Sequence, residues 1–472
     1  MGADTAAIGV FAALQQVEHE LLLFALFWFL VGLFDELAID GAWLWLRLTG
    51  RIRTGRSAPL CGSARLSGMH AVFVPAWQEA DVIGATIRHM LASWPHPELR
   101  LYIGIYRNDP ATLAAAASAA GADARVRLVV HDCAGPSTKA DCLNRLHAAL
   151  LDDEARAGRR FRAVVLHDAE DMVHPRALAE IDRALGSVDF VQLPVRPELQ
   201  PGSRWIAGHY ADEFAEAHAK AMTVRDALGA GLPAAGVGCG FARDALAALV
   251  RMRQRAGDGM AGPFAAECLT EDYELGLLIA RAGGRSRFLR LRDDDGGLVA
   301  TRSYFPDTIT TAVRQKTRWV HGIAFQSWER LGWSGRLVDI WMALRDRPGP
   351  LTALVLAAAY LLLALEAVLL VATLAGWHNP PPVGPETALL LTVTLAGFAW
   401  RAIMRFVFTA REYGPVEGLC AVLRIPVANV IAIMAGRRAF LAYLRTLRGA
   451  AVTWDKTAHL IHPAMLAARH PA

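Results

Sequence analysis

The sequence has few cysteines and no arrangement of them that marks a metal centre or a disulfide framework. Six occur among 472 residues, without a C-x-x-C pair or a regular spacing. This scatter argues against a zinc site and suits a reducing compartment, where free cysteine behaves as a small apolar residue. The six are Cys61, Cys133, Cys142, Cys239, Cys268 and Cys420.

A basic stripe and an internal repeat are also lacking, and no secretory leader is expected. The net charge is only +4 and the arginines form short clusters beside apolar segments, so we expect no nucleic-acid partner. Residues 1–20 contain no basic region, and we therefore expect no signal peptide. Hydrophobic residues are abundant, at 54% against 20% charged. This balance predicts a globular part attached to a few membrane-spanning helices.

The first apolar run, 21–34, is shorter than the roughly 20 residues that span a bilayer, but it continues into GAWLWL. We expect one helix over about 20–46 that spans the membrane or is steeply embedded, with a buried amphipathic helix as the alternative. Four arginines lie at or just after the end of this helix: Arg47, Arg51, Arg53 and Arg56. The positive-inside rule places this end in the cytoplasm.

Two later apolar runs, 351–376 and 388–410, are joined by WHNPPPVGPE, which contains no Lys or Arg. They predict a membrane hairpin with an external loop. Glu366 inside the hairpin should be paired or line a polar cavity, with Arg401 as the nearest candidate partner and Arg405 as the alternative. Segment 418–436 precedes four arginines that would have to leave the cytoplasm if it crossed, so an amphipathic helix on the inner membrane face is expected.

Between residues 70 and 300, short β-type runs alternate with Ala-rich helical patterns. This alternation predicts a mostly parallel sheet with helices on both faces, whose ligands bind at the carboxyl ends of the strands. The runs are HAVFVPAW, LRLYIGIY, VRLVVHD, FRAVVLHD and DFVQLPV.

One of these runs ends in a dense acidic group, AVVLHDAEDM at 163–172. Asp168, Glu170 and Asp171 repel one another unless a cation neutralises them, and Mg²⁺ or Mn²⁺ prefers such oxygen ligands and tolerates bridging diphosphates. The group predicts a metal–diphosphate site; the alternative is a solvated loop.

Two further motifs lie downstream, LTEDYELG at 269–276 and RQKTRWVHG at 314–322. Asp272 is a candidate general base for an acceptor hydroxyl, although an isolated Thr-Glu-Asp is more often a helix N-cap followed by surface charge. Arg318 offers a cation to a leaving diphosphate, and Trp319 offers a flat face to a sugar ring. An Arg-Trp pair is also typical of a membrane-interface helix.

The ordered set VPAWQE, TKADCLN, HDAED, TED and Q-x-x-R-W resembles the processive family 2 glycosyltransferases of the cellulose synthase type. AGPSTKADCLN, LHDAEDM, AGVGCGF, LTEDYELG, YFPDTITTAVRQKTRWVHGI and TWDKTAH are similar, more closely, to the bacterial phage-adsorption protein B family of inner-membrane glycosyltransferases. The likeness covers about residues 20–460. It implies an α/β GT-A catalytic domain with a Rossmann-like, mostly parallel sheet, plus transmembrane and interface helices.

The resemblance also implies roles for individual residues. The nucleotide and diphosphate are bound by Pro75, Ala76, Glu79, Asp109, Lys139 and Asp168. Asp272 is the base with Glu271 beside it, and acceptor and leaving group meet at Gln315, Arg318 and Trp319. Asp168, Glu170 and Asp171 hold Mg²⁺ or Mn²⁺, but Asp-Ala-Glu departs from the usual Asp-x-Asp, so which carboxylate completes the metal shell stays open. Gly236, Gly238 and Gly240 permit close approach of the acceptor or form a plain turn.

The expected organisation has five parts. They are an N-terminal transmembrane helix (1–48), a cytoplasmic GT-A domain (60–306), interface helices with Q-x-x-R-W (307–349), a transmembrane hairpin (350–410), and an amphipathic helix with a cytoplasmic tail (411–472). The expected activity is inverting, metal-dependent transfer from a nucleotide sugar, UDP-linked and of the N-acetylhexosamine class, to an exopolysaccharide or surface glycan, with an export partner in the outer membrane. The alternatives are single addition to a lipid carrier and a non-catalytic scaffold of a receptor complex.

Overall fold

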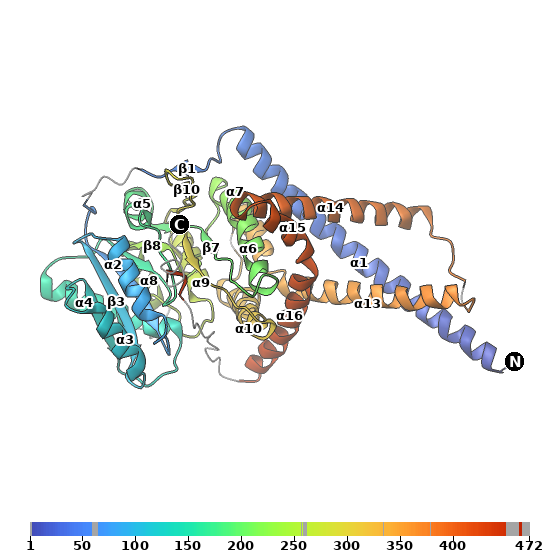
Figure 1. Ribbon diagram of the computed structural model, residues 1–472, viewed down its shortest axis with the longest axis horizontal. Helices are drawn as coiled ribbons and strands as arrows, with labels where there is room; N and C mark the ends of the chain where they lie inside the picture. The colour runs from blue at the N-terminus through green and yellow to red at the C-terminus, as the bar shows by residue number, and fades with distance from the viewer. Residues whose placement is uncertain are drawn as a thin grey trace.

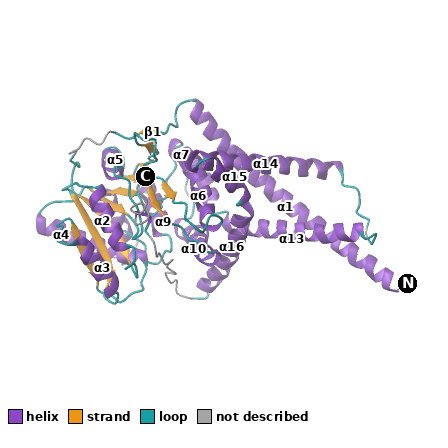
Figure 2. Cartoon of the chain, in the orientation of Figure 1, coloured by secondary structure: helices purple, strands orange, loops and turns teal. Residues whose placement is uncertain are grey.

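The computed structural model describes residues 2–58, 65–255, 257, 262–333, 335–377, 379–449 and 462–464, with side chains from residue 11 onward. Cys61 and the TWDKTAH motif at 453–459 lie outside the described residues. Figure 1 shows an α/β part joined to a helical part from which long helices extend, and Figure 2 shows that the strands are confined to the α/β part.

A seven-stranded sheet forms the centre of the α/β part, in the order β4-β3-β2-β5-β8-β6-β9. β8 pairs antiparallel with both of its neighbours, and the other pairings are parallel. The strands are β2 (His70–Ala76), β3 (Leu99–Tyr106), β4 (Val126–His131), β5 (Ala163–Leu166), β6 (Phe190–Gln192), β8 (Cys239–Ala242) and β9 (Ser286–Phe288). Two short parallel pairs accompany the sheet: β1 (Gly55–Arg56) with β10 (Leu291–Arg292), and β7 (Val195–Pro197) with β11 (Thr301–Ser303).

Helices cover both faces of this sheet because its central strands are apolar on both sides; every residue of β2 is buried. One core lies under α2 (Ile83–Ser93), α3 (Pro110–Ala120) and α5 (Ala177–Ala184). The second lies under α4 (Lys139–Ala157), α8 (Arg243–Arg255) and α9 (Glu271–Arg281). The predicted α/β class with a mostly parallel sheet is therefore confirmed.

The sequence runs and the strands correspond closely, with one addition. The five β-type runs form β2, β3, β4, β5 and β6, and β6 ends before the run does. AGVGCGF, which we interpreted as a turn or an acceptor contact, contributes β8 between β5 and β6. The glycine of β8, Gly240, leaves room for α5, because a Cβ atom there would lie 2.3 Å from the side chain of Ile181.

Among the described residues, the helical part contains four helices that are long and apolar enough to cross a membrane: Phe11–Leu48 within α1 (Gly2–Leu48), α13 (Gly349–Leu374), α14 (Pro385–Tyr413) and α16 (Ile425–Leu447). The chain therefore has the elements of a membrane-associated protein. Shorter helices join them to the sheet: α6 (Ile206–Glu216), the π-helix η1 (Ala217–Ala221), α7 (Met222–Ala227), α10 (Ile309–Val320), the π-helix η2 (His321–Gln326), α11 (Ser327–Leu331), α12 (Leu337–Asp346) and α15 (Pro415–Leu423).

α16 differs from the other long helices in its direction. Its first end lies at Arg424, which contacts Asp212 of α6 at 3.0 Å. Near its other end, Tyr443 stacks on Phe325 of η2, with ring centroids 4.5 Å apart. Because both ends contact the helices next to the sheet, α16 runs across the base of α1, α13 and α14 instead of extending with them (Figure 1).

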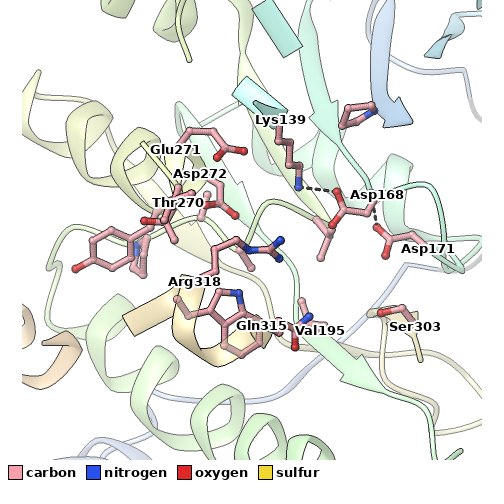
Figure 3. Close-up of a pocket in the computed structure, with 18 of the residues that line it drawn as sticks. Lys139, Asp168, Asp171, Val195, Thr270, Glu271, Asp272, Ser303, Gln315 and Arg318 are labelled. Carbon is pink, nitrogen blue, oxygen red and sulfur yellow. Dashed lines mark hydrogen bonds and ion pairs between the residues drawn. The ribbon is translucent and has the colours of Figure 1, made fainter. Parts of the chain in front are cut away.

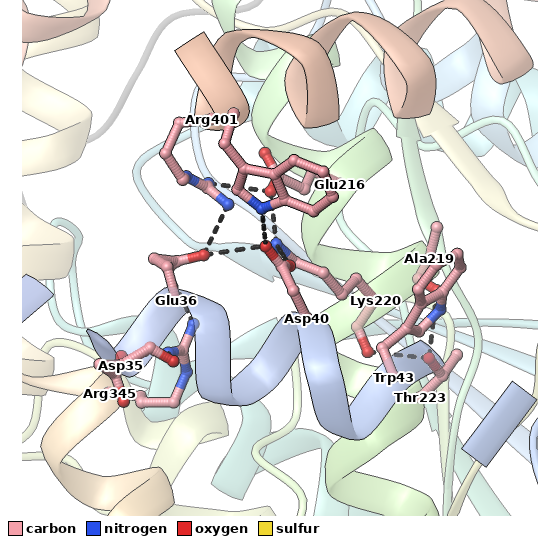
Figure 4. A network of polar contacts seen from close by, with 11 residues as sticks. Asp35, Glu36, Asp40, Trp43, Glu216, Ala219, Lys220, Thr223, Arg345 and Arg401 are labelled. Atoms are coloured by element: carbon pink, nitrogen blue, oxygen red, sulfur yellow. Dashed lines mark hydrogen bonds and ion pairs between the residues drawn. The ribbon is translucent and has the colours of Figure 1, made fainter. Parts of the chain in front are cut away.

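A charged network fastens α1 and α14 to the α/β part (Figure 4). Lys220 of η1 lies 2.6 Å from Asp40, 2.7 Å from Glu216 and 3.3 Å from Glu36. Arg401 of α14 contacts Glu36 at 2.6 Å and Glu216 at 2.9 Å. The Lys220 side chain is only 2% exposed, so the charges depend on one another for compensation.

The expected pairing of Glu366 with Arg401 is wrong. Arg401 is engaged by Glu36 and Glu216, whereas the Glu366 side chain is hydrogen-bonded to Glu18 of α1. Depth along the hairpin suggested the pair, but α1 passes alongside α13 and supplies the nearer partners.

Lys220→Met should destabilise the protein by about 3–5 kcal/mol, because it leaves three carboxylates short of a buried cation. Thermal unfolding of the protein in detergent measures this. Arg156→Met, at an exposed ion pair with Asp153, serves as the control and should change stability by less than about 1 kcal/mol. Equal melting temperatures for the two variants would contradict the proposed importance of the network.

Candidate active site

A cavity of about 380 Å³ lies at the carboxyl ends of the central strands. Pro75, Trp77 and Glu79 line it after β2, and Asp168 to Asp171 line it after β5. Further lining comes from the starts of α4 and α9, from α10, and from residues 303–305 at the end of β11. Segments far apart in the sequence therefore meet at the edge where an α/β sheet binds ligands (Figure 3).

Lys139 is the cation at the centre of this cavity. It opens α4, whose N-cap Thr138 accepts a hydrogen bond from the Asp141 N–H. Its Nζ lies 2.5 Å from Oδ1 of Asp168. Burial lowers the pKa of Lys139, but the charges of Asp168, Glu271 and Asp272 outweigh burial and raise the pKa above its usual value. Lys139 therefore remains an ammonium ion that compensates several carboxylates.

The acidic group after β5 divides into two kinds of carboxylate. Asp168 is one-third exposed and faces the cavity beside Lys139. Asp171 is almost fully buried, and its Oδ2 accepts hydrogen bonds from His167 Nδ1 at 2.8 Å and from the Asp168 N–H at 3.0 Å. Asp171 thus fixes the backbone that carries Asp168.

The three predicted metal ligands do not converge. In the described part of the chain, no three His, Cys, Asp or Glu side chains form a group that could hold a metal ion. The reason is that the Asp171 carboxylate is used by the loop itself. Asp168 and Glu170, which both line the cavity, nevertheless offer oxygen donors. This set fits Mg²⁺ or Mn²⁺, which often takes one or two carboxylates and completes its shell with phosphates and water.

Glu271 and Asp272 open α9, where the helix dipole favours negative charge. Both side chains line the cavity. Burial raises the pKa of Asp272, while Lys139 lowers it in part; burial and the charge of Asp272 raise the pKa of Glu271. Glu274, one turn on, instead pairs with Arg330 at 2.8 Å. Of the three acidic residues, only Glu271 and Asp272 can meet a ligand.

Residue 236 has to be a glycine because the Asp272 carboxylate lies against its backbone. Its φ is +73°, and a Cβ atom there would lie 2.3 Å from Oδ2 of Asp272 and 3.2 Å from Nζ of Lys139. Gly238 has a φ of +59°, and a Cβ atom there would lie 2.3 Å from Oγ1 of Thr301. Both glycines therefore make room for protein side chains, in addition to having the positive φ that a turn requires.

The Q-x-x-R-W motif lies on one face of α10, as the spacing of three and four residues requires. Gln315, Arg318 and Trp319 all line the cavity. Arg318 lies close enough to lower the pKa of Asp272, which opposes the effect of burial. Trp319 packs edge-on against Tyr210 of α6 at 5.9 Å, so the wall on this side is aromatic.

Two predicted nucleotide-binding residues, Ala76 and Asp109, are not among the side chains that line the cavity. Asp109 is the N-cap of α3 and accepts hydrogen bonds from the N–H groups of Thr112 and Gln78, the latter at 2.6 Å. Gln78 has a φ of +54°, so Asp109 holds the strained turn between Trp77 and Glu79.

Sequence reasoning missed Gln192. Its amide donates to the Val237 carbonyl at 2.9 Å and accepts from the Ala235 N–H at 2.8 Å, and it thereby holds the segment that contains Gly236. A buried polar residue within the apolar run DFVQLPV was the available signal. His218 of η1 also lines the cavity and carried no comparable signal.

Comparisons with known proteins agree on one family. The family model described as "Glycosyltransferase like family 2" matches residues 68–322. Bacteriophage adsorption protein B of Escherichia coli strain K12 and bacteriophage N4 adsorption protein B of E. coli O157:H7 are each 33% identical over 411 residues, which is 82% of this chain and 54% of the relative. The chain therefore spans about half the length of these curated relatives.

A solved structure supports the fold. The mannosyltransferase PcManGT from Pyrobaculum calidifontis, in complex with GDP-Man and Mn²⁺, matches 85% of this chain and 99% of its own at a TM-score of 0.50 and 17% identity. The architecture is therefore GT-A with added helices.

Gly236→Ala should lower catalytic turnover by at least about tenfold, because the new methyl group displaces Asp272, and misplacement by about 1 Å can cost 10²-fold. Gly202→Ala is the matched control, since Gly202 also has positive φ (+86°) but nothing within 4 Å of its Cβ position. Both variants should lose about 1–2 kcal/mol of stability from the left-handed backbone. Turnover and thermal unfolding of the purified proteins separate the two effects; similar turnover in both would contradict this account of Gly236.

Proposed function

Because the chain belongs to the family 2 glycosyltransferases, we propose that it transfers a sugar from a nucleoside diphosphate donor to a surface glycan at the inner membrane of a bacterium. The observation that carries the proposal is the convergence of Asp168, Lys139, Asp272 and Arg318 on one cavity. Two cations and several carboxylates suit a reaction in which a diphosphate is bound and a hydroxyl loses its proton.

The donor is proposed to bind on the side of β2 and α4. Pro75, Trp77 and Glu79 surround the nucleoside, and Lys139 contacts the diphosphate. Asp168 and Glu170 would hold a divalent cation, which supplies positive charge to the diphosphate when bound. Asp109 supports this side indirectly, through the turn at Gln78.

The acceptor hydroxyl is proposed to bind between Asp272 and the aromatic wall of α10. Its oxygen forms a bond to the anomeric carbon while the bond from that carbon to the diphosphate breaks, and its proton passes to the Asp272 carboxylate. Arg318 stabilises the charge that develops on the leaving diphosphate. A single displacement of this kind inverts the anomeric configuration.

The acceptor is proposed to be a growing surface polysaccharide, following the names of the relatives, which describe bacteriophage adsorption. Addition of one sugar to a lipid carrier would use the same geometry, and product length distinguishes the two. A scaffold without activity is disfavoured, because it has no need of a costly cluster of buried carboxylates.

Nucleotide release by the purified protein, screened over UDP- and GDP-linked sugars with Mg²⁺, Mn²⁺ or excess chelator, tests the proposal. Release that requires both a nucleotide sugar and a divalent ion, with a glycan product, is expected. Absence of release with every donor would favour the scaffold.

Asp272→Asn should retain nucleotide binding while transfer falls by about 10²- to 10⁴-fold, the scale of general-base loss. Asp168→Ala should instead lose the donor, because its carboxylate belongs to the diphosphate side of the cavity. Equilibrium nucleotide binding and transfer rates, measured on both variants, separate these roles. Transfer by Asp272→Asn at near the wild-type rate would move the base to Glu271, since Glu274 pairs with Arg330.

Residues 376–387, between α13 and α14, should face the periplasm, while residue 60 and the C-terminus face the cytoplasm. The distribution of Lys and Arg supports this, as does the contact of both ends of α16 with the helices next to the sheet, α6 and η2. Alkaline phosphatase inserted after Pro382 should be active, and green fluorescent protein at the C-terminus should fluoresce. Phosphatase activity at the C-terminus would mean that α16 spans the membrane.

A further inference from the structure

Residues 462–464 lie against the loop that carries Asp168, although almost 300 residues separate them in the sequence. His462 is completely buried, and its Nε2 lies 3.1 Å from the backbone carbonyl oxygen of Asp171. The Ala464 N–H donates to Nδ1 of the same ring at 3.1 Å. Because Nδ1 accepts, the ring proton lies on Nε2, which donates to Asp171.

The loop after Asp168 is held from three sides. His462 binds the carbonyl of Asp171, the backbone of Arg302 exchanges two hydrogen bonds with Met172 at 2.7 and 2.9 Å, and His89 Nε2 binds the carbonyl of Val173 at 2.9 Å. The rings of His462 and His89 lie near each other, with centroids 6.2 Å apart. Among these contacts to the loop, the one from His462 is made by a residue that follows Gly449 in the sequence.

This contact leads directly to the donor side of the cavity. The carboxylate of Asp171 holds the Asp168 N–H at 3.0 Å, and the Asp168 carboxylate meets Lys139. A displacement of the Asp171 backbone therefore moves Asp168. His462 itself does not line the cavity, so it acts only through Asp171.

We propose that His462 is a positioning residue for donor binding: the segment 462–464 braces the acidic loop so that Asp168 is held in the geometry that receives a diphosphate and its divalent cation. The inference rests on the proposed function of Asp168. Partners that orient a ligating group from behind are often worth 10- to 100-fold in metal affinity or activity.

Three substitutions separate positioning from simple packing. His462→Leu keeps much of the volume and removes both hydrogen bonds. His462→Gln can place an amide N–H near the former Nε2, whereas His462→Asn remains polar but is too short to reach Asp171. His147→Leu is the matched control, because His147 is also buried (2% exposed) and lies on α4 outside the cavity lining.

The protein in detergent is titrated with UDP and with GDP in the presence of Mn²⁺, and the Mn²⁺ concentration for half-maximal nucleotide binding is measured alongside thermal unfolding. His462→Leu and His462→Asn should weaken nucleotide binding and raise the Mn²⁺ requirement by about 10-fold or more, and His462→Gln should restore much of both. His147→Leu should change the melting temperature but neither binding quantity.

The possible failures are distinct. If the wild-type protein binds neither nucleotide with Mn²⁺, the proposed function fails. If the wild type binds and the Leu and Asn variants bind equally well, or if all His462 variants only lower the melting temperature as His147→Leu does, the positioning role is overturned. Should His462→Leu not fold, the comparison of His462→Asn with His462→Gln decides the matter.

Discussion

Compensation of negative charge by one ammonium group, that of Lys139, is the constraint on which the cavity depends. Asp168, Glu271 and Asp272 all act on Lys139, and without it they would repel one another in a buried place. The fold meets this requirement by starting α4 at Lys139, ending β5 just before Asp168, and starting α9 at Glu271. Gly236 completes the arrangement, because a side chain there would overlap with Asp272. Strand order, helix starts and one glycine therefore serve the same electrostatic requirement.

The sequence predicted the sheet better than it predicted the partition of the carboxylates. Apolar runs that end in polar residues indicate parallel strands, because a strand that is buried on both faces has a continuous run of apolar residues. By contrast, Asp168 and Asp171 have the same chemistry and lie three residues apart, yet Asp168 is one-third exposed beside Lys139, whereas Asp171 is buried and accepts hydrogen bonds from its own loop. Glu274 likewise forms an ion pair with Arg330, and Asp109 accepts a hydrogen bond from the Gln78 N–H. Such choices depend on tertiary partners that no spacing encodes.

The helical part shows the same limit. Hydropathy located the segments that became α1, α13 and α14, but pairing by depth failed for Glu366, because α1 supplies Glu18 to Glu366 and Glu36 to Arg401. The glycines of AGVGCGF were predicted to form a turn or to admit the acceptor. Gly236 and Gly238 have the positive φ of a turn, and the three glycines also make room for Asp272, Thr301 and Ile181. A glycine in the sequence indicates that another group approaches the backbone closely, but only the structure shows which group it is.

The short π-helix η1 contributes side chains both to the cavity and to the charged network of the long helices. His218 lines the cavity, and Lys220, two residues later, sits among Asp40, Glu36 and Glu216 in the charged network of the long helices. A π-turn inserts an extra residue into the helix and thereby changes which side chains share a face. The network fixes Lys220 to α1 and, through Glu216 and Arg401, to α14. Since His218 and Lys220 share one five-residue segment, the ion pairs that hold Lys220 to α1 and α14 also hold the backbone that carries His218 to the cavity wall.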